Sequence, residues 1–203
     1  MAVEVFDPEG RPIVGGVGEL VCVKAWPGMT RGLWNDPERY LQTYWSRWPD
    51  VWTHGDWASI DSDGEWFLHG RSDDTLKVSG KRIGPAEVEA VLVAHPLISE
   101  AAAVGLPHEI KGEGIWAFVV LQGETPPAML VTLEAELVDR VATALGRSFA
   151  PEHVVVIPEL PKTRSGKVVR RVLRAKVLGD DPGDLSTLEN PGSLDDLLVR
   201  VQR

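Results

Sequence analysis

Two stretches of the sequence combine charged side chains with glycine in patterns typical of a nucleotide site. The longer one, residues 70–89, reads GRSDDTLKVSGKRIGPAEVE. The guanidinium groups of Arg71 and Arg82 suit ribose hydroxyls and phosphate oxygens, because they present several donors in one plane. Gly80 lets a ligand pass close to the backbone, since it has no side chain. The alternative is a solvated loop with surface salt bridges, which contribute little stability.

The second stretch, residues 161–167, reads PKTRSGK and introduces a helix that we expect at about 167–178. Ser165 and Gly166 favour a flexible entry to this helix, which leaves the compact ammonium charge of Lys167 on a mobile segment. Such a charge can meet a carboxylate or a phosphate. The alternative is a merely basic amphipathic helix. Helical spacing predicts a core face of Val168, Val169, Val172 and Leu173 and an outer face of Arg170, Arg171 and Arg174.

Two shorter segments add candidates. Asp56 ends the tetrapeptide THGD at an expected strand end, where a carboxylate can accept two hydrogen bonds from a ribose diol. The alternative for Asp56 is a turn residue that binds its own backbone. His95 lies at an expected helix end, where a lone histidine more often caps or packs than binds a metal.

An α+β fold has to position these residues. Residues 1–70 show the alternation and turn signals of β-structure, and the following residues alternate between strand and helix patterns over a length that can form its own core. We therefore place a domain boundary near residues 70–74. The expected strands are 1–6, 18–25, 51–60, 65–70, 75–78, 98–105, 115–121 and 154–157, and the expected helices are 36–45, 85–94, 131–145 and 167–178.

Composition excludes several classes of protein. The net charge of −9, from 21 basic and 30 acidic residues, argues against general nucleic-acid binding, and seven basic residues without an acid between 161 and 176 indicate a local anion site. The single cysteine, Cys22, excludes an internal disulfide and a multi-cysteine zinc site. No apolar run approaches the ~18–20 residues that span a bilayer. Without a leader pattern either, we expect a cytoplasmic protein with no membrane partner.

Taken in order, these segments resemble the adenylate-forming acyl-CoA synthetases, and within them the C-terminal end of the acetyl-CoA synthetases. The resemblance runs from about Val17 to the tail, where residues 185–192, LSTLENPG, are similar to that family's ending. It implies an enzyme that joins a carboxylate such as acetate to AMP with Mg²⁺ and ATP, releases pyrophosphate, and transfers the acyl group to CoA. A small C-terminal lid domain swings between the two half-reactions.

The resemblance also implies a role for each matching residue. Asp56 and Arg71 resemble the ribose-binding pair, Arg82 the arginine that approaches the ATP phosphates, and Asp73 the hinge. Lys167 resembles the lysine that enters the site for adenylation, and a lysine acetyltransferase and deacetylase acting there are implied as partners. Gly80 resembles the glycine beside the pantetheine tunnel, with Ser79 next to it at the CoA thiol. A divalent ion is expected at Val93, His95 and Ile98.

Three positions depart from the pattern. Lys81 replaces the usual histidine, and Gly84-Pro85 replaces the usual Gly-Thr, so that a propionyl-CoA or other acyl-CoA synthetase stays open. Ala142 stands where an arginine would meet the CoA 3′-phosphate, and Arg140 and Arg147 are the substitutes to test.

The expected organisation is a small β-subdomain at 1–72 that ends an adenylation domain, a mobile α+β lid domain at 73–180, and an acidic surface tail at 181–203. Since no Ser/Thr/Gly-rich phosphate loop and no acyl pocket precede residue 17, the chain matches the last third of such an enzyme and is expected to be inactive alone. It could be a fragment, a split gene product or a truncated reading frame. The alternative function is a non-catalytic lid that complements a separately encoded adenylation domain.

Overall fold

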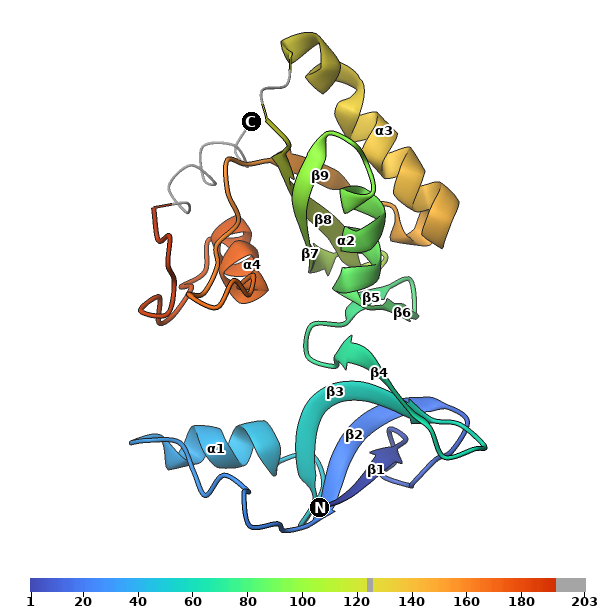
Figure 1. Ribbon diagram of the computed structural model, residues 1–203, viewed down its shortest axis with the longest axis vertical. Helices are drawn as coiled ribbons and strands as arrows, with labels where there is room; N and C mark the ends of the chain where they lie inside the picture. Colours follow the sequence, from blue (N-terminus) through green and yellow to red (C-terminus); the bar gives the residue numbers. More distant parts are fainter. Residues whose placement is uncertain (124–125, 193–203) are drawn as a thin grey trace. The chain divides into compact units, whose positions relative to one another are not determined.

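The computed structural model describes residues 1–123 and 126–192, and it divides into two compact units, Met1–Asp73 and Asp74–Arg203 (Figure 1). We describe each unit by itself. Residues 124–125, between the strand expected at 115–121 and the helix expected at 131–145, and residues 193–203, the end of the expected tail, lie outside the described residues. No helix in the described ranges is both long and apolar enough to cross a membrane.

The first unit is a four-stranded antiparallel sheet with one helix. The strands follow one another in the order β1 (Ala2–Phe6), β2 (Val17–Lys24), β3 (Trp52–Ile60) and β4 (Trp66–Arg71). A tight turn closes the β3–β4 hairpin, because Asp61 Oδ1 accepts the N–H groups of Asp63 and Glu65, each at 2.9 Å. This hairpin sets Asp56 on β3 directly opposite Arg71 on β4.

Helix α1 (Pro37–Tyr44) begins where the sequence predicts. The side chain of Asp36 accepts the N–H of Arg39 at 3.1 Å, and Pro37 occupies the first helical position, where its missing N–H costs nothing. The helix contacts β3 through aromatic rings, with Tyr44 stacked on the buried Trp52 at a centroid distance of 4.2 Å.

The second unit is a five-stranded sheet with helices on both faces. The strand order is β6-β5-β8-β7, and β9 pairs in parallel with β8 while the other pairs are antiparallel. The strands are β5 (Leu76–Val78), β6 (Lys81–Ile83), β7 (Ile98–His108), β8 (Gly112–Leu121) and β9 (His153–Val156). The helices are α2 (Pro85–Val93), α3 (Pro127–Leu145) and α4 (Arg170–Leu178), and a 3₁₀ turn covers Arg147–Phe149.

Strand alternation on β8 produces two separate cores. Ile115, Ala117 and Val119 point to one face, where they pack with residues of α2 and α3. Phe118 points to the other face, where it packs with Leu173 of α4. Because successive strand residues face opposite sides, one strand serves both helical layers, as the placement of α2, α3 and α4 in Figure 1 shows.

The α+β class predicted from the sequence is confirmed, but several elements differ from the prediction. The helix expected at 131–145 begins at Pro127, and the 3₁₀ turn at Arg147–Phe149 was not predicted. Strand β6 was not predicted, because Lys81 and Arg82 give it a loop-like composition. The last helix was predicted to begin at Lys167 but begins at Arg170. The tail was expected to lie on the surface, whereas Leu188 is buried against Val172.

Candidate functional site

Lys167 lies in a tight turn between two short extended segments of the second unit. Lys162 and Val168 form an antiparallel bridge, and the Thr163 N–H donates to the Lys167 carbonyl at 2.9 Å. Thr163 Oγ1 accepts the N–H of Lys167 at 3.2 Å. Gly166 has a φ of 78°, a conformation that favours glycine, and its N–H donates to the Thr163 carbonyl. We call the segment from Lys162 to Val168 the lysine turn.

The lysine turn explains why the helix begins later than predicted. Val169 donates its N–H to the Pro161 carbonyl at 2.9 Å, so the residues after Lys167 continue a β-type pairing instead of a helix. Lys167 is exposed, and within the described part of the chain its ammonium group takes part in no ion pair. The result is a cation presented on a hydrogen-bonded turn that precedes the helix.

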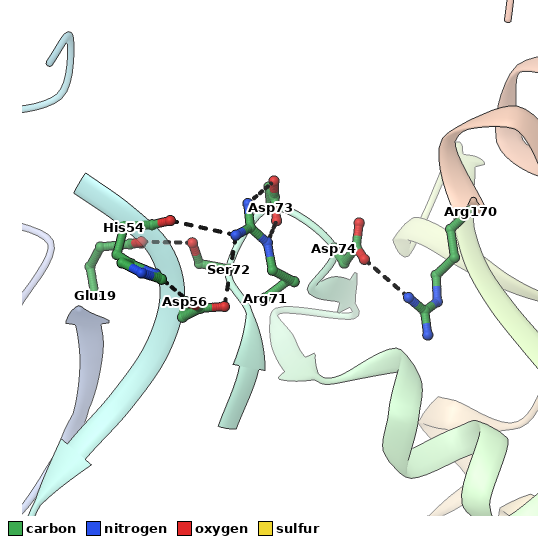
Figure 2. A network of polar contacts seen from close by, with 8 residues as sticks. All are labelled: Glu19, His54, Asp56, Arg71, Ser72, Asp73, Asp74 and Arg170. Carbon is green, nitrogen blue, oxygen red and sulfur yellow. Dashed lines mark hydrogen bonds and ion pairs between the residues drawn. The ribbon is translucent and has the colours of Figure 1, made fainter. Parts of the chain in front are cut away.

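Asp56 and Arg71 form one polar network in the first unit (Figure 2). Arg71 Nη1 lies 3.9 Å from Asp56 Oδ1, and His54 Nδ1 lies 2.5 Å from Asp56 Oδ2. Gly55 lies between His54 and Asp56 on β3, and a Cβ added at Gly55 would lie 2.7 Å from Arg71 Nη2. The sheet register and this glycine together hold the carboxylate and the guanidinium close to each other.

Asp73, the predicted hinge residue, holds the same guanidinium. Its carboxylate accepts two hydrogen bonds from Arg71, at 2.9 Å from Nε and 2.7 Å from Nη2, in the bidentate geometry that favours this pair. Ser72 donates to the fully buried Glu19 at 2.8 Å, and Arg47 donates to the other oxygen of Glu19 at 2.5 Å. The chain is therefore anchored on β2 immediately before the end of the first unit.

Ser79 and Gly80 form the two-residue turn of the β5–β6 hairpin. Both have positive φ, 51° for Ser79 and 77° for Gly80, which matches the twist of a tight hairpin. The Ser79 N–H donates to the Lys111 carbonyl at 2.8 Å, and a Cβ added at Gly80 would meet no atom within 4 Å. Arg82 lies on β6 of the same hairpin, opposite Lys77 and with an exposed side chain.

Arg170, which the sequence predicted on the outer face, is half-buried in an ion-pair network. Its guanidinium donates to Glu89 of α2 at 2.8 and 2.7 Å. It also donates to Asp74 at 3.2 Å, the contact drawn in Figure 2. Hydrogen bonding to Glu89 raises the pKa of Arg170 above its usual value, although burial opposes this. Glu89 also accepts the N–H of Ala103 at 2.9 Å. The network joins the first residue of the second unit to α2, β7 and α4.

The expected metal residues lie where α2 ends. His95 Nδ1 accepts the N–H of Leu97 at 3.2 Å, its Nε2 lies 3.7 Å from Glu136, and its carbonyl accepts the N–H of Ile98. In the described ranges no group of three or more His, Cys, Asp or Glu side chains could hold a metal. Val93 ends α2 and Ile98 begins β7, and because both side chains are hydrocarbons, these two residues could meet Mg²⁺ only through main-chain oxygens, which are hard ligands.

Arg140, one of the two arginines considered for the CoA phosphate, already has partners. It donates from Nε to the Val91 carbonyl at 3.1 Å and from Nη2 to the Ala94 carbonyl at 3.0 Å. It therefore caps α2 from α3. Ala142 is half-buried on α3, whereas Arg147, at the start of the 3₁₀ turn, is exposed.

The structure thus brings the predicted residues together in groups. Asp56, Arg71 and Asp73 meet in the first unit, and Ser79, Gly80 and Arg82 share one hairpin of the second unit, while Lys167 and His95 lie on other elements. Sequence reasoning missed the partners that hold these groups. Helical periodicity placed Arg170 outside, and nothing local to residues 19, 89 or 190 indicated their long-range contacts.

Comparison with known proteins shows which proteins this chain resembles. Residues 87–167 match the model of the AMP-binding enzyme C-terminal domain. The chain is 46% identical to the acetyl-coenzyme A synthetase of Pyrobaculum arsenaticum over 196 residues and 47% identical to that of Syntrophus aciditrophicus over 198 residues. These alignments cover 96% of this chain, 29% of the first relative and 30% of the second. The chain is homologous to the C-terminal part of the acetyl-CoA synthetases.

The solved structures agree with this assignment. Acetoacetyl-CoA synthetase from Streptomyces lividans superposes with a TM-score of 0.81 at 28% identity, over 98% of this chain and 30% of that one. The matched residues 87–167 include β7, β8, α3 and β9, most of α2, and the lysine turn as far as Lys167. The chain spans about 30% of the length of its acetyl-CoA synthetase relatives.

Proposed function

We propose that these residues form the last part of an ATP-dependent acyl-CoA ligase that activates acetate as acetyl-AMP and then transfers the acetyl group to CoA. The observation that supports this proposal is the 46–47% identity to acetyl-coenzyme A synthetases over 96% of the chain. In the proposal, residues 1–72 end the adenylation domain, residues 73–180 are a mobile lid, and residues 181–203 are its tail.

The ribose of the nucleotide would bind at the Asp56–Arg71 pair. Asp56 offers carboxylate oxygens to the two hydroxyls, and Arg71 offers N–H donors beside them. His54 at 2.5 Å orients the carboxylate, and Asp73 fixes the plane of the guanidinium through two hydrogen bonds. These contacts give both groups a defined geometry before the ligand arrives.

Lys167 would act in the adenylation step. A carboxylate that attacks the α-phosphate brings anions together, and negative charge grows on the phosphate oxygens as the new P–O bond forms and the bond to pyrophosphate breaks. An ammonium group on the lysine turn stabilises that charge without giving up a proton. Arg82 would contact the phosphates, and a bound Mg²⁺ would supply further positive charge.

CoA would use the β5–β6 hairpin in the second step. Its thiol attacks the acyl carbonyl and releases AMP, and Gly80 leaves room for the pantetheine arm because no side chain projects there. Ser79 lies beside it in the turn. Rotation about Asp73 would exchange the lysine turn for this hairpin, a gating motion between two half-reactions.

The test is a chimera in which residues 1–203 replace the corresponding part of an active acetyl-CoA synthetase. Lys167→Ala should lower acetate-dependent pyrophosphate exchange by roughly 10²–10³-fold, the usual loss for one transition-state charge contact. Thioester formation from supplied acetyl-AMP should survive. Arg164→Ala is the matched control, because Arg164 is an exposed cation in the same turn. Equal losses in both half-reactions would overturn the assigned role of Lys167.

A further inference from the structure

The chain that follows α4 returns to the lysine turn and pairs with it. Thr163 and Leu188 form an antiparallel bridge, and the Glu189 N–H donates to the Lys162 carbonyl at 2.9 Å. Arg171 on α4 donates to the Asp184 carbonyl at 2.5 Å, and this bond holds the chain after α4 against the helix. We call residues 185–190 the strap.

Asn190 joins the strap to the segment that enters the lysine turn. Its side-chain oxygen accepts the Lys162 N–H at 3.0 Å, and its side-chain nitrogen donates to the Leu160 carbonyl at 2.9 Å. In a sheet, the main chain of a neighbouring strand would bind this N–H and this carbonyl. The side-chain amide of Asn190 replaces that main-chain partner. Replacement by alanine removes both bonds at once.

Leu188 anchors the strap in a small apolar cluster of its own. Its side chain is 7% exposed and packs with the fully buried Val172 of α4, and Val169 and Leu185 complete the cluster. The two main cores of the second unit contain neither Leu188 nor Val172. A change at Leu188 should therefore loosen the strap and leave the sheet intact.

Thr163 connects the strap to Lys167. Its main chain pairs with Leu188 on one side, and on the other its N–H and Oγ1 bind the carbonyl and the N–H of Lys167. We propose that the strap is a positioning element for Lys167, acting through Leu188 and Asn190 on Thr163. This inference rests on the proposed function for the role of Lys167, but its structural half can be tested without any activity.

Another contact on the lysine turn does not replace the strap. Lys162 Nζ lies 2.6 Å from Glu100 of β7, but the two side chains are 30% and 39% exposed. Ion pairs with that exposure contribute little and weaken further in salt. The strap, in contrast, supplies the buried contact of Leu188, the main-chain bond from Glu189 to Lys162 and the two side-chain bonds of Asn190.

The first experiment measures amide hydrogen exchange on the 203-residue chain. Asn190→Ala and Leu188→Ala should each speed exchange of the Gly166 and Lys167 amides by roughly tenfold or more, since local opening becomes easier. Amides of β7 and β8 should keep their rates. Thr187→Ala is the matched control, because Thr187 is an exposed strap residue, and Leu188→Met should restore protection by conserving volume. Unchanged exchange at Lys167, or faster exchange throughout the sheet, would overturn the proposal.

The second experiment uses the chimera and both half-reactions. Asn190→Ala should lower pyrophosphate exchange by roughly tenfold, the loss expected when hydrogen-bonded support is removed, and should spare thioester formation. In a Lys167→Ala background, Asn190→Ala should cause no further loss of pyrophosphate exchange, because both changes act through the Lys167 ammonium group. If Asn190→Ala lowers pyrophosphate exchange as much in the Lys167→Ala background as it does alone, the positioning role is overturned. If Lys167→Ala alone has no effect, the proposed function fails, while the exchange result still decides whether the strap holds the turn.

Discussion

At the scale of single residues, the candidate ligand groups are held by neighbours that were not obvious from their own positions. Arg71 donates two hydrogen bonds to Asp73 and lies close to Asp56, so its guanidinium is oriented on two sides. Lys167 is held through its main chain by Thr163, which leaves the side chain exposed. Fixing the backbone and leaving the charged end accessible lowers the ordering cost of contact with a ligand.

Substitutions at Gly80 give a prediction that separates the effect of backbone strain from the effect of side-chain size. Its φ of 77° penalises any L side chain, while the space around a Cβ is open. In the chimera, Gly80→Ala tests the strain alone, and Gly80→Leu adds bulk on the proposed pantetheine path. We expect Gly80→Leu to lower thioester formation well below Gly80→Ala and to leave pyrophosphate exchange nearly unchanged.

The measurement is the two half-reaction rates of both variants. If alanine and leucine lower the thioester rate equally, hairpin strain accounts for the effect. Gly80 would then be a turn glycine without a role in CoA binding.

At the scale of elements, the second unit is tied together by a pair of charges far apart in the sequence. The Arg170–Glu89 pair joins α4 to α2, and Glu89 also receives the Ala103 N–H from β7. The side chains are 24% and 14% exposed. Loss of Glu89 would leave the half-buried guanidinium of Arg170 with Asp74 alone, and an incompletely satisfied half-buried charge costs more than the intact pair contributes.

Glu89→Gln should therefore destabilise the chain by about 1–3 kcal/mol, the penalty for leaving a half-buried charged group poorly satisfied. Urea unfolding followed by tryptophan fluorescence and circular dichroism measures this change. Glu87→Gln is the matched control, because Glu87 only accepts the Gly84 N–H at the start of α2 and glutamine can do the same. Equal stability of the two variants would show that the ion-pair network adds nothing beyond surface charge.

At the scale of the whole molecule, the proposed function needs more than the 203 residues. The sequence contains no Ser/Thr/Gly-rich phosphate loop and no residues assigned to an acyl pocket. We expect the purified chain to show no acetate-dependent pyrophosphate exchange above a buffer blank, since the substrate positioning worth ~7–11 kcal/mol of barrier is not supplied. Measurable exchange by the chain alone would contradict this expectation.

The hinge gives a second whole-molecule prediction. Proline at position 73 fixes φ and removes the freedom needed for rotation, so Asp73→Pro in the chimera should retain one half-reaction and lose the other. Asp73→Ala separates this effect from loss of the bonds to Arg71. Retention of both half-reactions in Asp73→Pro would rule out a hinge at this residue.

Local signals in the sequence were sufficient for most elements and for the types of group at the site. Asp36 and Pro37 predicted the start of α1, and residues 61–64 predicted the β3–β4 turn, because caps and turns are satisfied within a few residues. The charged and glycine-rich segments around Arg71 and Lys167 indicated an anion site for the same reason, since side-chain chemistry is a local property.

Tertiary structure decided which partners these side chains and their main chain bind. Val168 and Val169 fit helical spacing and β-pairing equally well, and the pairing with residues 161–163 selected the extended form. Arg170 turned inward because Glu89, 81 positions earlier, offered a bidentate carboxylate. Asn190 bonded to residues about thirty positions before it. Each of these outcomes depends on free energy gained from partners that only folding brings close, and no local pattern encodes them.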